Sequence, residues 1–267
     1  MVFIEKLKKT IEKNKSQVCI GLDPDLSKFP THLKSNPEAI YEFNKSIIEG
    51  TVDVVCAYKP NIAFYEAEGW AGLQALKKTI EFIAGRVPVI LDAKRGDIGN
   101  TAQAYAKSIF EDFKADAVTL SPYMGLDSLE PFLKYKDKGA FILCLTSNPG
   151  ADDFQKPDLY KQVASKVFQW NVKYKNMGLV VGATNGKQIQ EIRKIAPGIP
   201  FLVPGVGAQG GDLEEVFRKG VFTKEDIVII NSSRKIIYAS AGKDYAQAAK
   251  QATHQLNTEI NKIRSSL

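Results

Sequence analysis

Short apolar runs alternate with longer amphipathic segments along almost the whole chain. The apolar runs are rich in Val, Ile, Leu and Ala, as is typical of parallel strands buried on both faces. The predicted strands are Val18–Leu22, Val52–Tyr58, Val87–Leu91, Ala117–Leu120, Ala140–Leu145, Gly178–Gly182, Pro200–Val203 and Asp226–Ile230. The predicted helices between them include Glu38–Ile48, Gly69–Ile83, Thr101–Phe113 and Leu159–Asn171. This alternation predicts repeated strand–helix–strand units and a parallel sheet.

Eight such units in 267 residues favour a closed (β/α)8 TIM barrel, because barrels of this kind commonly use about 250 residues as one domain. A doubly wound open sheet is the alternative. No composition break divides the chain, so residues 1–267 are expected to form a single barrel domain. The longest irregular piece is Asn148–Pro157, after the fifth strand. It is either a surface connection or a lid over a substrate.

The N-terminal segment, the length of the apolar stretches and the cysteines indicate the cellular compartment of the protein. Residues Met1–Gln17 alternate apolar and charged positions, which predicts an amphipathic helix and not a signal peptide. No apolar stretch reaches membrane-spanning length. Cys19, Cys56 and Cys144 lie far apart in apolar runs, so they are expected to be buried thiols in a reducing compartment. We therefore expect a cytoplasmic protein with no membrane association.

The formal net charge of +6 narrows the possible partners only slightly. A lysine-rich soluble surface explains it, and attraction of an anionic small molecule is a sharper possibility. The lysines are scattered and are not interleaved with aromatic residues, which disfavours a nucleic-acid groove. Two isolated histidines and no carboxylate cluster of ligand spacing disfavour a metal site.

Polar and ionisable residues follow most of the predicted strands. They include Asp23, Lys59, Asp92, Lys94, Thr146, Ser147, Gln209, Asn231, Ser232, Ser233 and Arg234, and the glycines Gly205 and Gly207 follow the seventh strand. In barrel enzymes the active site is built at the carboxyl ends of the strands. The pattern therefore indicates an enzyme.

The segment from Leu91 to Thr101 reads LDAKRGDIGNT and carries most of the candidate chemistry. Asp92 and Lys94 share the alternation of an extended strand, so both side chains are expected to face the barrel mouth. Lys59 reaches the same mouth from the second strand. Thr101 is placed to cap the next helix. The plain alternative is an ordinary ion pair followed by a turn at Asp97.

The glycine-rich run Gly205–Gly211 follows the seventh strand, and Arg234 follows the eighth. Backbone N–H groups at close approach and a bidentate cation suit a phosphate, which barrels often bind at this place. Glycines also serve ordinary turns, so Gln209 and Arg234 are needed to strengthen this interpretation.

In order along the chain, these segments together resemble the orotidine 5'-phosphate decarboxylase family, and in particular its longer-chain bacterial (type 2) branch. The resemblance rests on Gly21-Leu-Asp23-Pro-Asp25, Tyr58-Lys59-Pro60, Asp92-Ala-Lys94-Arg-Gly-Asp97-Ile-Gly-Asn-Thr101, Ser147-Asn-Pro-Gly150, Pro204-Gly-Val-Gly207-Ala-Gln209-Gly-Gly211-Asp212 and Asn231-Ser-Ser-Arg234. The family fold is a (β/α)8 barrel that works as a homodimer with shared active sites and without a cofactor or metal.

The resemblance implies conversion of orotidine 5'-phosphate to uridine 5'-phosphate and CO2 in pyrimidine biosynthesis. Lys59, Asp92 and Lys94 would form a charge array with Asp97 of the second subunit, and Lys94 would protonate C6 of the pyrimidine. The implied substrate contacts are Asp23 and Thr101 on ribose, Ser147 on the base, and Gly205, Gly207, Gln209, Ser233 and Arg234 around the phosphate.

Two other functions remain open on the residues alone. A magnesium-dependent sugar-phosphate decarboxylase or aldol-type enzyme would keep the barrel, but the cation of Lys59 disfavours a metal at that position. A non-catalytic binder of phosphorylated ligands would have little need of a buried charge array, which is costly.

Overall fold

The computed structural model describes residues 1–206 and 212–267, and within them eight parallel strands form one sheet. Neighbouring strands follow the order β2-β1-β8-β7-β6-β5-β4-β3. The strands are β1 Val18–Leu22, β2 Ala57–Pro60, β3 Ile90–Arg95, β4 Ala117–Leu120, β5 Gly139–Leu145, β6 Met177–Val181, β7 Phe201–Pro204 and β8 Val228–Ser232. Parallel bridges between Tyr58 and Val89 and between Asn61 and Asp92 join β2 to β3. The sheet therefore closes, and the prediction of a (β/α)8 barrel is confirmed.

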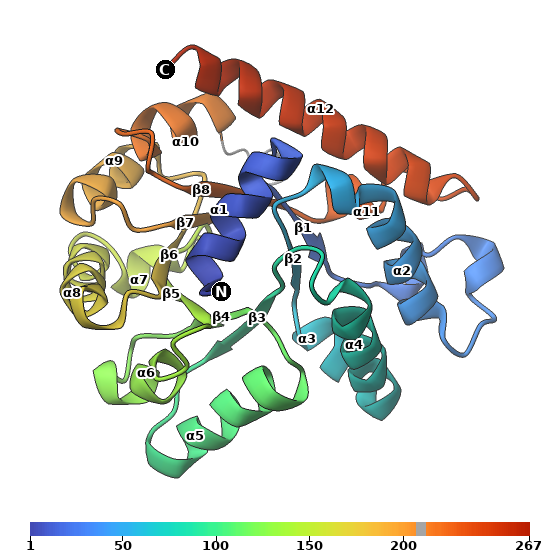
Figure 1. Cartoon of the computed structure of the whole chain (residues 1–267), viewed down its shortest axis with the longest axis horizontal. Helices are drawn as coiled ribbons and strands as arrows, with labels where there is room; N and C mark the ends of the chain where they lie inside the picture. Colours follow the sequence, from blue (N-terminus) through green and yellow to red (C-terminus); the bar gives the residue numbers. More distant parts are fainter. Residues whose placement is uncertain (207–211) are drawn as a thin grey trace.

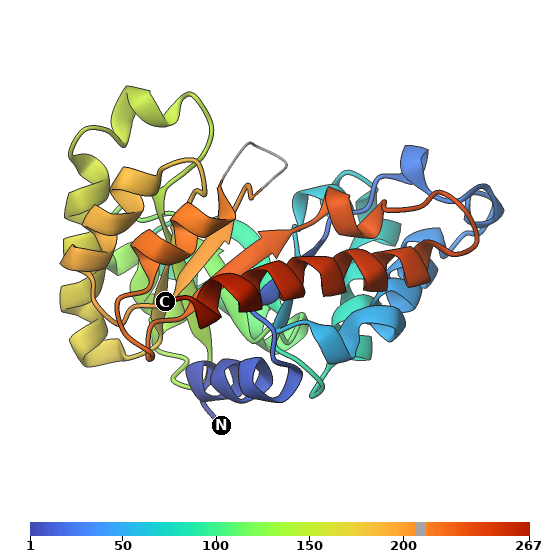
Figure 2. The same ribbon diagram turned by 90° about the horizontal axis from the view of Figure 1, so that it is seen from above.

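Helices surround the strands, as Figure 1 shows. They are α1 Phe3–Asn14, α2 Ala39–Thr51, α3 Ala63–Glu66, α4 Gly69–Ile83, α5 Gly99–Lys107, α6 Leu126–Leu133, α7 Ala151–Phe154, α8 Leu159–Tyr174, α9 Gly186–Ile195, α10 Leu213–Gly220, α11 Arg234–Ile237 and α12 Tyr245–Ser265. The α1 helix lies across one end of the barrel, and α7 lies on the opposite side of the molecule (Figure 2).

The α1 helix closes the amino-terminal end of the barrel. The Phe3 ring lies edge-on to Phe141 inside the barrel, with ring centroids 5.8 Å apart. A side chain at Gly139, the first residue of β5, would collide with the Phe3 ring. Lys6 forms an ion pair with Asp116, just before β4, at 2.7 Å. The amino-terminal end of the barrel is therefore covered, and the carboxyl ends of the strands are the end at which a ligand would enter.

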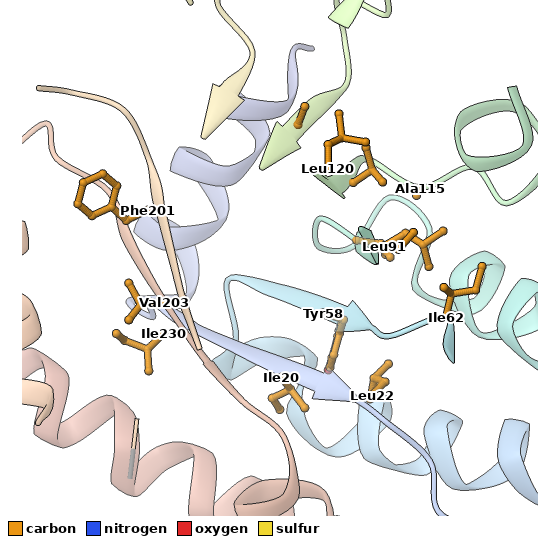
Figure 3. Packing of buried hydrophobic residues seen from close by; sticks show 14 of the residues in the cluster. Ile20, Leu22, Tyr58, Ile62, Leu91, Ala115, Leu120, Phe201, Val203 and Ile230 are labelled. Carbon is orange, nitrogen blue, oxygen red and sulfur yellow. The ribbon is translucent and has the colours of Figure 1, made fainter. Parts of the chain in front are cut away.

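Two apolar layers hold the barrel together. The smaller one fills the barrel interior and includes Phe141 and Ile229. The larger one lies between the strands and the surrounding helices, and Figure 3 shows Ile20, Leu91 and Val203 among its members. Because successive residues of a strand point to opposite faces, each strand supplies both layers. Inward-facing positions at the carboxyl ends are then left for polar side chains.

The predicted strand Val52–Tyr58 is wrong at its start, because only Ala57 and Tyr58 of this range belong to β2. Val52–Val54, expected to begin the strand Val52–Tyr58, form a short 3-10 helix that continues from α2, and β2 begins only at Ala57. The Asn14 amide donates to the carbonyls of Val52 and Val55. The carbonyl oxygens of this apolar stretch are thus satisfied by a side chain from a distant helix and not by a strand partner. As a result Lys59 lies within β2, not after it.

The third strand is also displaced from its prediction. β3 begins at Ile90 and ends at Arg95, so Asp92 and Lys94 lie inside it, where the prediction ended the strand at Leu91. The predicted helix Thr101–Phe113 begins two residues earlier, at Gly99, and ends in a π-helical turn at Ser108–Asp112. Asn148–Pro157 is not wholly irregular, since it contains α7. The remaining boundaries agree with prediction to within about three residues, as is usual for helix and strand ends.

Candidate active site

Three charged side chains meet at the carboxyl end of the barrel. Lys59 Nζ donates to Asp92 Oδ2 at 2.7 Å, and Lys94 Nζ donates to Asp92 Oδ1 at 2.6 Å. The side chains of Lys59 and Asp92 are 6% and 10% exposed, whereas that of Lys94 is 49% exposed. The carboxylate is therefore held between two ammonium groups, and Lys94 is the one that reaches solvent at the barrel mouth.

The charges of this cluster stabilise one another. Burial by itself would raise the pKa of Asp92, but the charges and hydrogen bonds of Lys59 and Lys94 hold that pKa well below its ordinary value. Burial likewise favours the neutral amine of Lys59, yet the negative charges of Asp92 and Asp23 raise the pKa of Lys59 above its usual value. Lys59 and Asp92 are both ionised at neutral pH.

The backbone of β3 is irregular at Lys94, whose φ of +47° lies in the left-handed region. The prediction that Asp92 and Lys94 follow the regular alternation of an extended strand is therefore wrong at Lys94. The register between β3 and β4 shifts between the pairs Leu91–Val118 and Arg95–Leu120. Three residues of β3 thus lie opposite a single residue of β4, Thr119.

Thr119 belongs to the charged cluster, although the sequence pattern did not single it out. Its Oγ1 donates to Asp92 Oδ1 at 2.8 Å and accepts from the backbone N–H groups of Ala93 and Lys94 at 3.1 and 3.0 Å. Thr119 is 2% exposed. The only available signal was a hydroxyl within the otherwise apolar strand AVTL, at a position that faces into the barrel.

Buried polar atoms without a partner gather at the same end of the barrel. Among the described residues, Asp23 Oδ1, Ser147 Oγ, Asn231 Oδ1 and Ser233 Oγ have no hydrogen-bond partner. They lie on or directly after the carboxyl ends of β1, β5 and β8. Because buried polar groups are normally hydrogen-bonded, such a group of atoms is what a polar ligand would satisfy. The sequence places Asn231 among the polar residues at the strand ends but predicts no substrate contact for it.

Two glycines allow the serines to approach the site. A side chain at Gly21 in β1 would place its Cβ 2.7 Å from the Ser233 Cβ, and one at Gly182 would collide with the Ser147 hydroxyl. The strands that neighbour these serines therefore have no room for larger residues. This close approach gives both glycines a steric role.

Other predicted site residues lie away from the three charges. Asp97 accepts from the Ile98 backbone N–H at 2.8 Å, and none of its hydrogen bonds or ion pairs within the described chain reaches Lys59 or Lys94. Thr101 is exposed and lies in the first turn of α5. The prediction that Thr101 caps this helix is wrong, because the helix begins at Gly99 and the N-cap position is Ile98.

The predicted phosphate site is only partly described. Gly205 follows β7 with a φ of +93°, a conformation that favours glycine, and the exposed Arg234 begins α11 after β8. Gly207 and Gln209 lie outside the described residues. The structure brings Gly205, Ser233 and Arg234 to the same end of the barrel, since β7 and β8 are paired from Phe201–Val228 to Pro204–Asn231.

The segment after β5 is joined to the rim of the site. Gln155 follows α7, and its side-chain oxygen accepts from the backbone N–H of Thr146 at 2.7 Å. Asn185 donates to the Thr146 carbonyl at 3.2 Å. These contacts fix the strand end that carries Ser147. Whether Asn148–Pro157 acts as a lid stays a prediction.

Within residues 1–206 and 212–267, no group of three or more His, Cys, Asp and Glu side chains could hold a metal ion. Over the same described ranges, no helix has both the length and the apolar character needed to cross a membrane.

Family models, curated sequences and solved structures all relate this chain to orotidine 5'-phosphate decarboxylases. The model described as "Orotidine 5'-phosphate decarboxylase / HUMPS family" matches residues 16–252. The curated orotidine 5'-phosphate decarboxylase of Dehalococcoides mccartyi is 49% identical over 99% of both chains. That of Herpetosiphon aurantiacus is 52% identical over 94% of both chains.

Solved structures agree in fold as well as in sequence. The orotidine monophosphate (OMP) decarboxylase of Leishmania donovani aligns with a TM-score of 0.87 and 40% identity over 99% of both chains. The uridine monophosphate (UMP) synthase of the same organism aligns with a TM-score of 0.88 and 42% identity, over 99% of this chain and 57% of that one. By its family model and by its curated relatives, this chain belongs to the orotidine 5'-phosphate decarboxylase / HUMPS family.

Proposed function

We propose that Lys94 delivers the proton to C6 when this chain converts orotidine 5'-phosphate to uridine 5'-phosphate and CO2 in pyrimidine biosynthesis. The observation that carries the proposal is the position of Asp92 between two lysines. The side chain of Lys59 is buried inside the barrel, whereas that of Lys94 is half exposed at the barrel mouth. Lys94 is thus the ammonium of the pair that a substrate can meet.

The reaction leaves negative charge where Lys94 can stabilise it. The bond between C6 and the carboxylate carbon breaks, CO2 departs, and the electron pair stays on C6. The Lys94 ammonium stabilises this developing charge and then transfers a proton to C6, after which the neutral amine recovers a proton from solvent. Asp92 would lie near the substrate carboxylate, so their repulsion falls as CO2 leaves. Lys59 holds Asp92 in place and charged.

The unpartnered buried atoms supply the substrate contacts in this proposal. Asp23 accepts from a ribose hydroxyl, Ser147 bonds to the pyrimidine amide, and Ser233 lies with Gly205 and Arg234 at the phosphate end. Arg234 can meet a phosphate with two parallel hydrogen bonds. The proposed contacts of Gly207 and Gln209 to the phosphate fall outside the described residues.

We further propose a homodimer whose active sites are shared. Among the described residues, neither Asp97 nor Thr101 forms a side-chain hydrogen bond or ion pair with the charged cluster of its own chain, although the family resemblance assigns both to the site. Ile98, next to Asp97 in the chain, is 51% exposed. Tyr123 and Met124, which follow β4 at the same end of the barrel, are 85% and 47% exposed. Contiguous exposed apolar surface marks interaction sites, and Tyr123 and Met124 are adjacent along the chain. A second copy that covers them would bring its Asp97 to the Lys94 of the first.

The proposed setting of this activity is the cytoplasm, with residues 1–267 acting as one catalytic domain. All three cysteines are free and buried. Burial raises the pKa of Cys19 to about 12, and it also raises the pKa of Cys56 and Cys144. Unpaired, unreactive thiols are typical of a reducing compartment.

The ultraviolet absorbance of orotidine 5'-phosphate measures the activity directly, with EDTA-treated protein. Lys94→Ala is expected to lower kcat by at least about 100- to 10,000-fold, the range for loss of a general acid. Lys173→Ala, whose side chain is 71% exposed on α8, is the matched control and is expected to keep wild-type turnover. Circular dichroism should show the same folded barrel for both variants.

Exchange of the C6 hydrogen of uridine 5'-phosphate in D2O, followed by NMR, separates protonation from loss of CO2. The wild type should catalyse this exchange, and Lys94→Ala should not. Near-normal turnover or exchange by folded Lys94→Ala would contradict the role of Lys94. Complete inactivity of the folded wild type, with or without magnesium, would favour a sugar-phosphate substrate or a binding function instead.

A further inference from the structure

We infer that Thr119 is a positioning residue for catalysis: its hydroxyl sets the place of Asp92 and the backbone conformation of Lys94 at once. The inference deepens the proposed function, because it rests on the role of Lys94. Its basis is the three hydrogen bonds of Thr119 Oγ1, to Asp92 Oδ1 and from the N–H groups of Ala93 and Lys94.

The hydrogen-bonding capacity of this hydroxyl is fully used inside the protein. A threonine hydroxyl has one hydrogen to donate and two lone pairs that accept. The hydrogen goes to Asp92 at 2.8 Å, and the two lone pairs receive the amides at 3.1 and 3.0 Å. No capacity remains for a substrate atom. Thr119 can therefore affect the reaction only through the residues that it holds.

The irregularity of β3 explains why a hydroxyl is needed at this position. Between the pairs Leu91–Val118 and Arg95–Leu120, three residues of β3 lie opposite one residue of β4. The side chain of Thr119 accepts the N–H groups of Ala93 and Lys94 in place of a strand carbonyl. It thereby supports the left-handed φ of +47° at Lys94, a conformation that is costly for a residue with a side chain.

The same hydroxyl completes the set of donors around Asp92. Lys59 bonds to one carboxylate oxygen, while Lys94 and Thr119 both bond to the other, at 2.6 and 2.8 Å. Thr119 is neutral and lies on the next strand, so it fixes the rotation of the carboxylate independently of either lysine. Without it, both the carboxylate and the backbone that carries Lys94 can shift. Displacements of about 1 Å in such a site can cost about 100-fold in rate.

The test compares Thr119→Val, which has the same shape without the hydroxyl, with Thr119→Ser, which keeps it. Thr119→Val is expected to lower kcat for orotidine 5'-phosphate by about 10- to 100-fold, as expected for loss of hydrogen bonds to a charged group. The Kd for uridine 5'-phosphate, measured by calorimetry, should change by less than about threefold, because Thr119 does not touch the ligand. Thr119→Ser should recover kcat to within about threefold of the wild type.

Thr253→Val is the matched control. Thr253 is also fully buried, but among the described residues its hydroxyl bonds only to the carbonyl of Ala249 within α12. The same chemical change there should leave kcat unaltered. Thr119→Cys, with a weaker donor and acceptor of similar size, provides a second reading if Thr119→Val does not fold. A kcat between those of Thr119→Ser and Lys94→Ala is expected for it.

Exchange of the C6 hydrogen of uridine 5'-phosphate in D2O should fall in parallel with kcat in Thr119→Val. Wild-type kcat and exchange in folded Thr119→Val or Thr119→Cys would overturn the inference while leaving the role of Lys94 intact. So would equal losses of kcat in Thr119→Val and Thr119→Ser. An inactive wild type would instead overturn the proposed function, and the inference with it.

Discussion

Asp92 accepts hydrogen bonds from Lys59, Lys94 and Thr119 although its side chain is only 10% exposed. An isolated carboxylate in such surroundings would become neutral. Here two cations and a hydroxyl replace the lost water, so the charge is retained at neutral pH. Removing one partner of a buried ion pair leaves the other charge uncompensated. In the proposed mechanism, stability and catalysis therefore depend on the same atoms.

The pKa of Asp92 predicts how the stability of the protein depends on pH. Because the folded-state pKa lies below the ordinary value of 3.8, the carboxylate stabilises the folded state above that value. This contribution is lost as pH falls through 3.8 toward the lower folded-state pKa. Asp92→Asn should lower the free energy of unfolding at pH 7 by about 3–5 kcal/mol.

The difference between wild type and Asp92→Asn should then shrink as the pH is lowered from 5 to about 2, because the carboxylate of the unfolded chain binds a proton in this range while that of the folded protein stays charged. Urea unfolding at several pH values measures this difference. Asp153→Asn, at an exposed aspartate of α7, is the control for a general effect of removing one carboxylate. A difference that stays constant across this pH range would show that folding does not lower the pKa of Asp92.

At the scale of elements, the alternation of strands and helices could be predicted from the sequence because apolar periodicity reflects burial directly. β1 and β4 and the helix α4 have the predicted bounds. The start of β2 could not be predicted, because Val52, Val54 and Val55 give this segment the valine-rich character of a strand. What makes Val52–Val54 helical is a set of long-range bonds, from Asn14 to Val52 and Val55 and from Asn257 to Val54. Periodicity carries no information on such partners.

In the candidate site, too, some residues could be predicted from the sequence and others depend on long-range contacts. The motif around Asp92 and Lys94 identified the charged cluster, and the structure brings Lys59 to it. Thr119 could not be found, because a threonine in a buried strand is ordinary until the irregular pairing of β3 and β4 is known. In the proposed dimer, the relation of Asp97 to the cluster depends on a second copy of the chain, which one sequence does not describe.

The buried cation of Arg193 connects the helices α9 and α10 with the start of β7. Arg193 in α9 is fully buried. It donates to the carbonyls of Gly220 and Ile199, both at 2.7 Å, and its Nη1 lies 3.2 Å from Asp226. Its guanidinium also lies 3.7 Å from the centre of the Phe201 ring at the start of β7. Desolvation lowers the pKa of Arg193 to about 10.

Arg193→Met is expected to lower the free energy of unfolding by about 3 kcal/mol, because it leaves Asp226 without its cation and two buried carbonyls without donors. The KM for orotidine 5'-phosphate in the remaining folded protein should not change, since Arg193 lies outside the active site. Arg218→Met removes an exposed ion pair with Glu214 in α10 and should cost less than about 1 kcal/mol. Equal losses in chemical denaturation would argue against a special role for Arg193.

At the scale of the whole molecule, the proposed dimer predicts complementation between two inactive chains. Asp97→Ala and Lys94→Ala each damage one contributor to the shared site. In a mixed dimer one of the two sites receives an intact Lys94 from one chain and an intact Asp97 from the other. Mixing the two variants should therefore restore up to about one quarter of wild-type activity per chain, given random pairing of subunits.

Co-purification with two different affinity tags establishes that mixed dimers have formed. Mixing Lys94→Ala with Asp92→Asn is the control, because both changes damage the same half of the site and cannot complement. Absence of recovered activity in isolated Asp97→Ala/Lys94→Ala dimers would contradict the shared site.

The position of α1 also determines how the molecule can be attached to a support. Met1 is 72% exposed, and α1 covers the end of the barrel opposite the strand ends that carry Lys94 (Figure 2). A linker joined to Met1 would leave the substrate entrance turned toward the bulk solution. Immobilisation on a bead or an electrode through Met1 therefore orients the substrate entrance of each molecule away from the support. Random coupling through surface lysines does not give this single orientation.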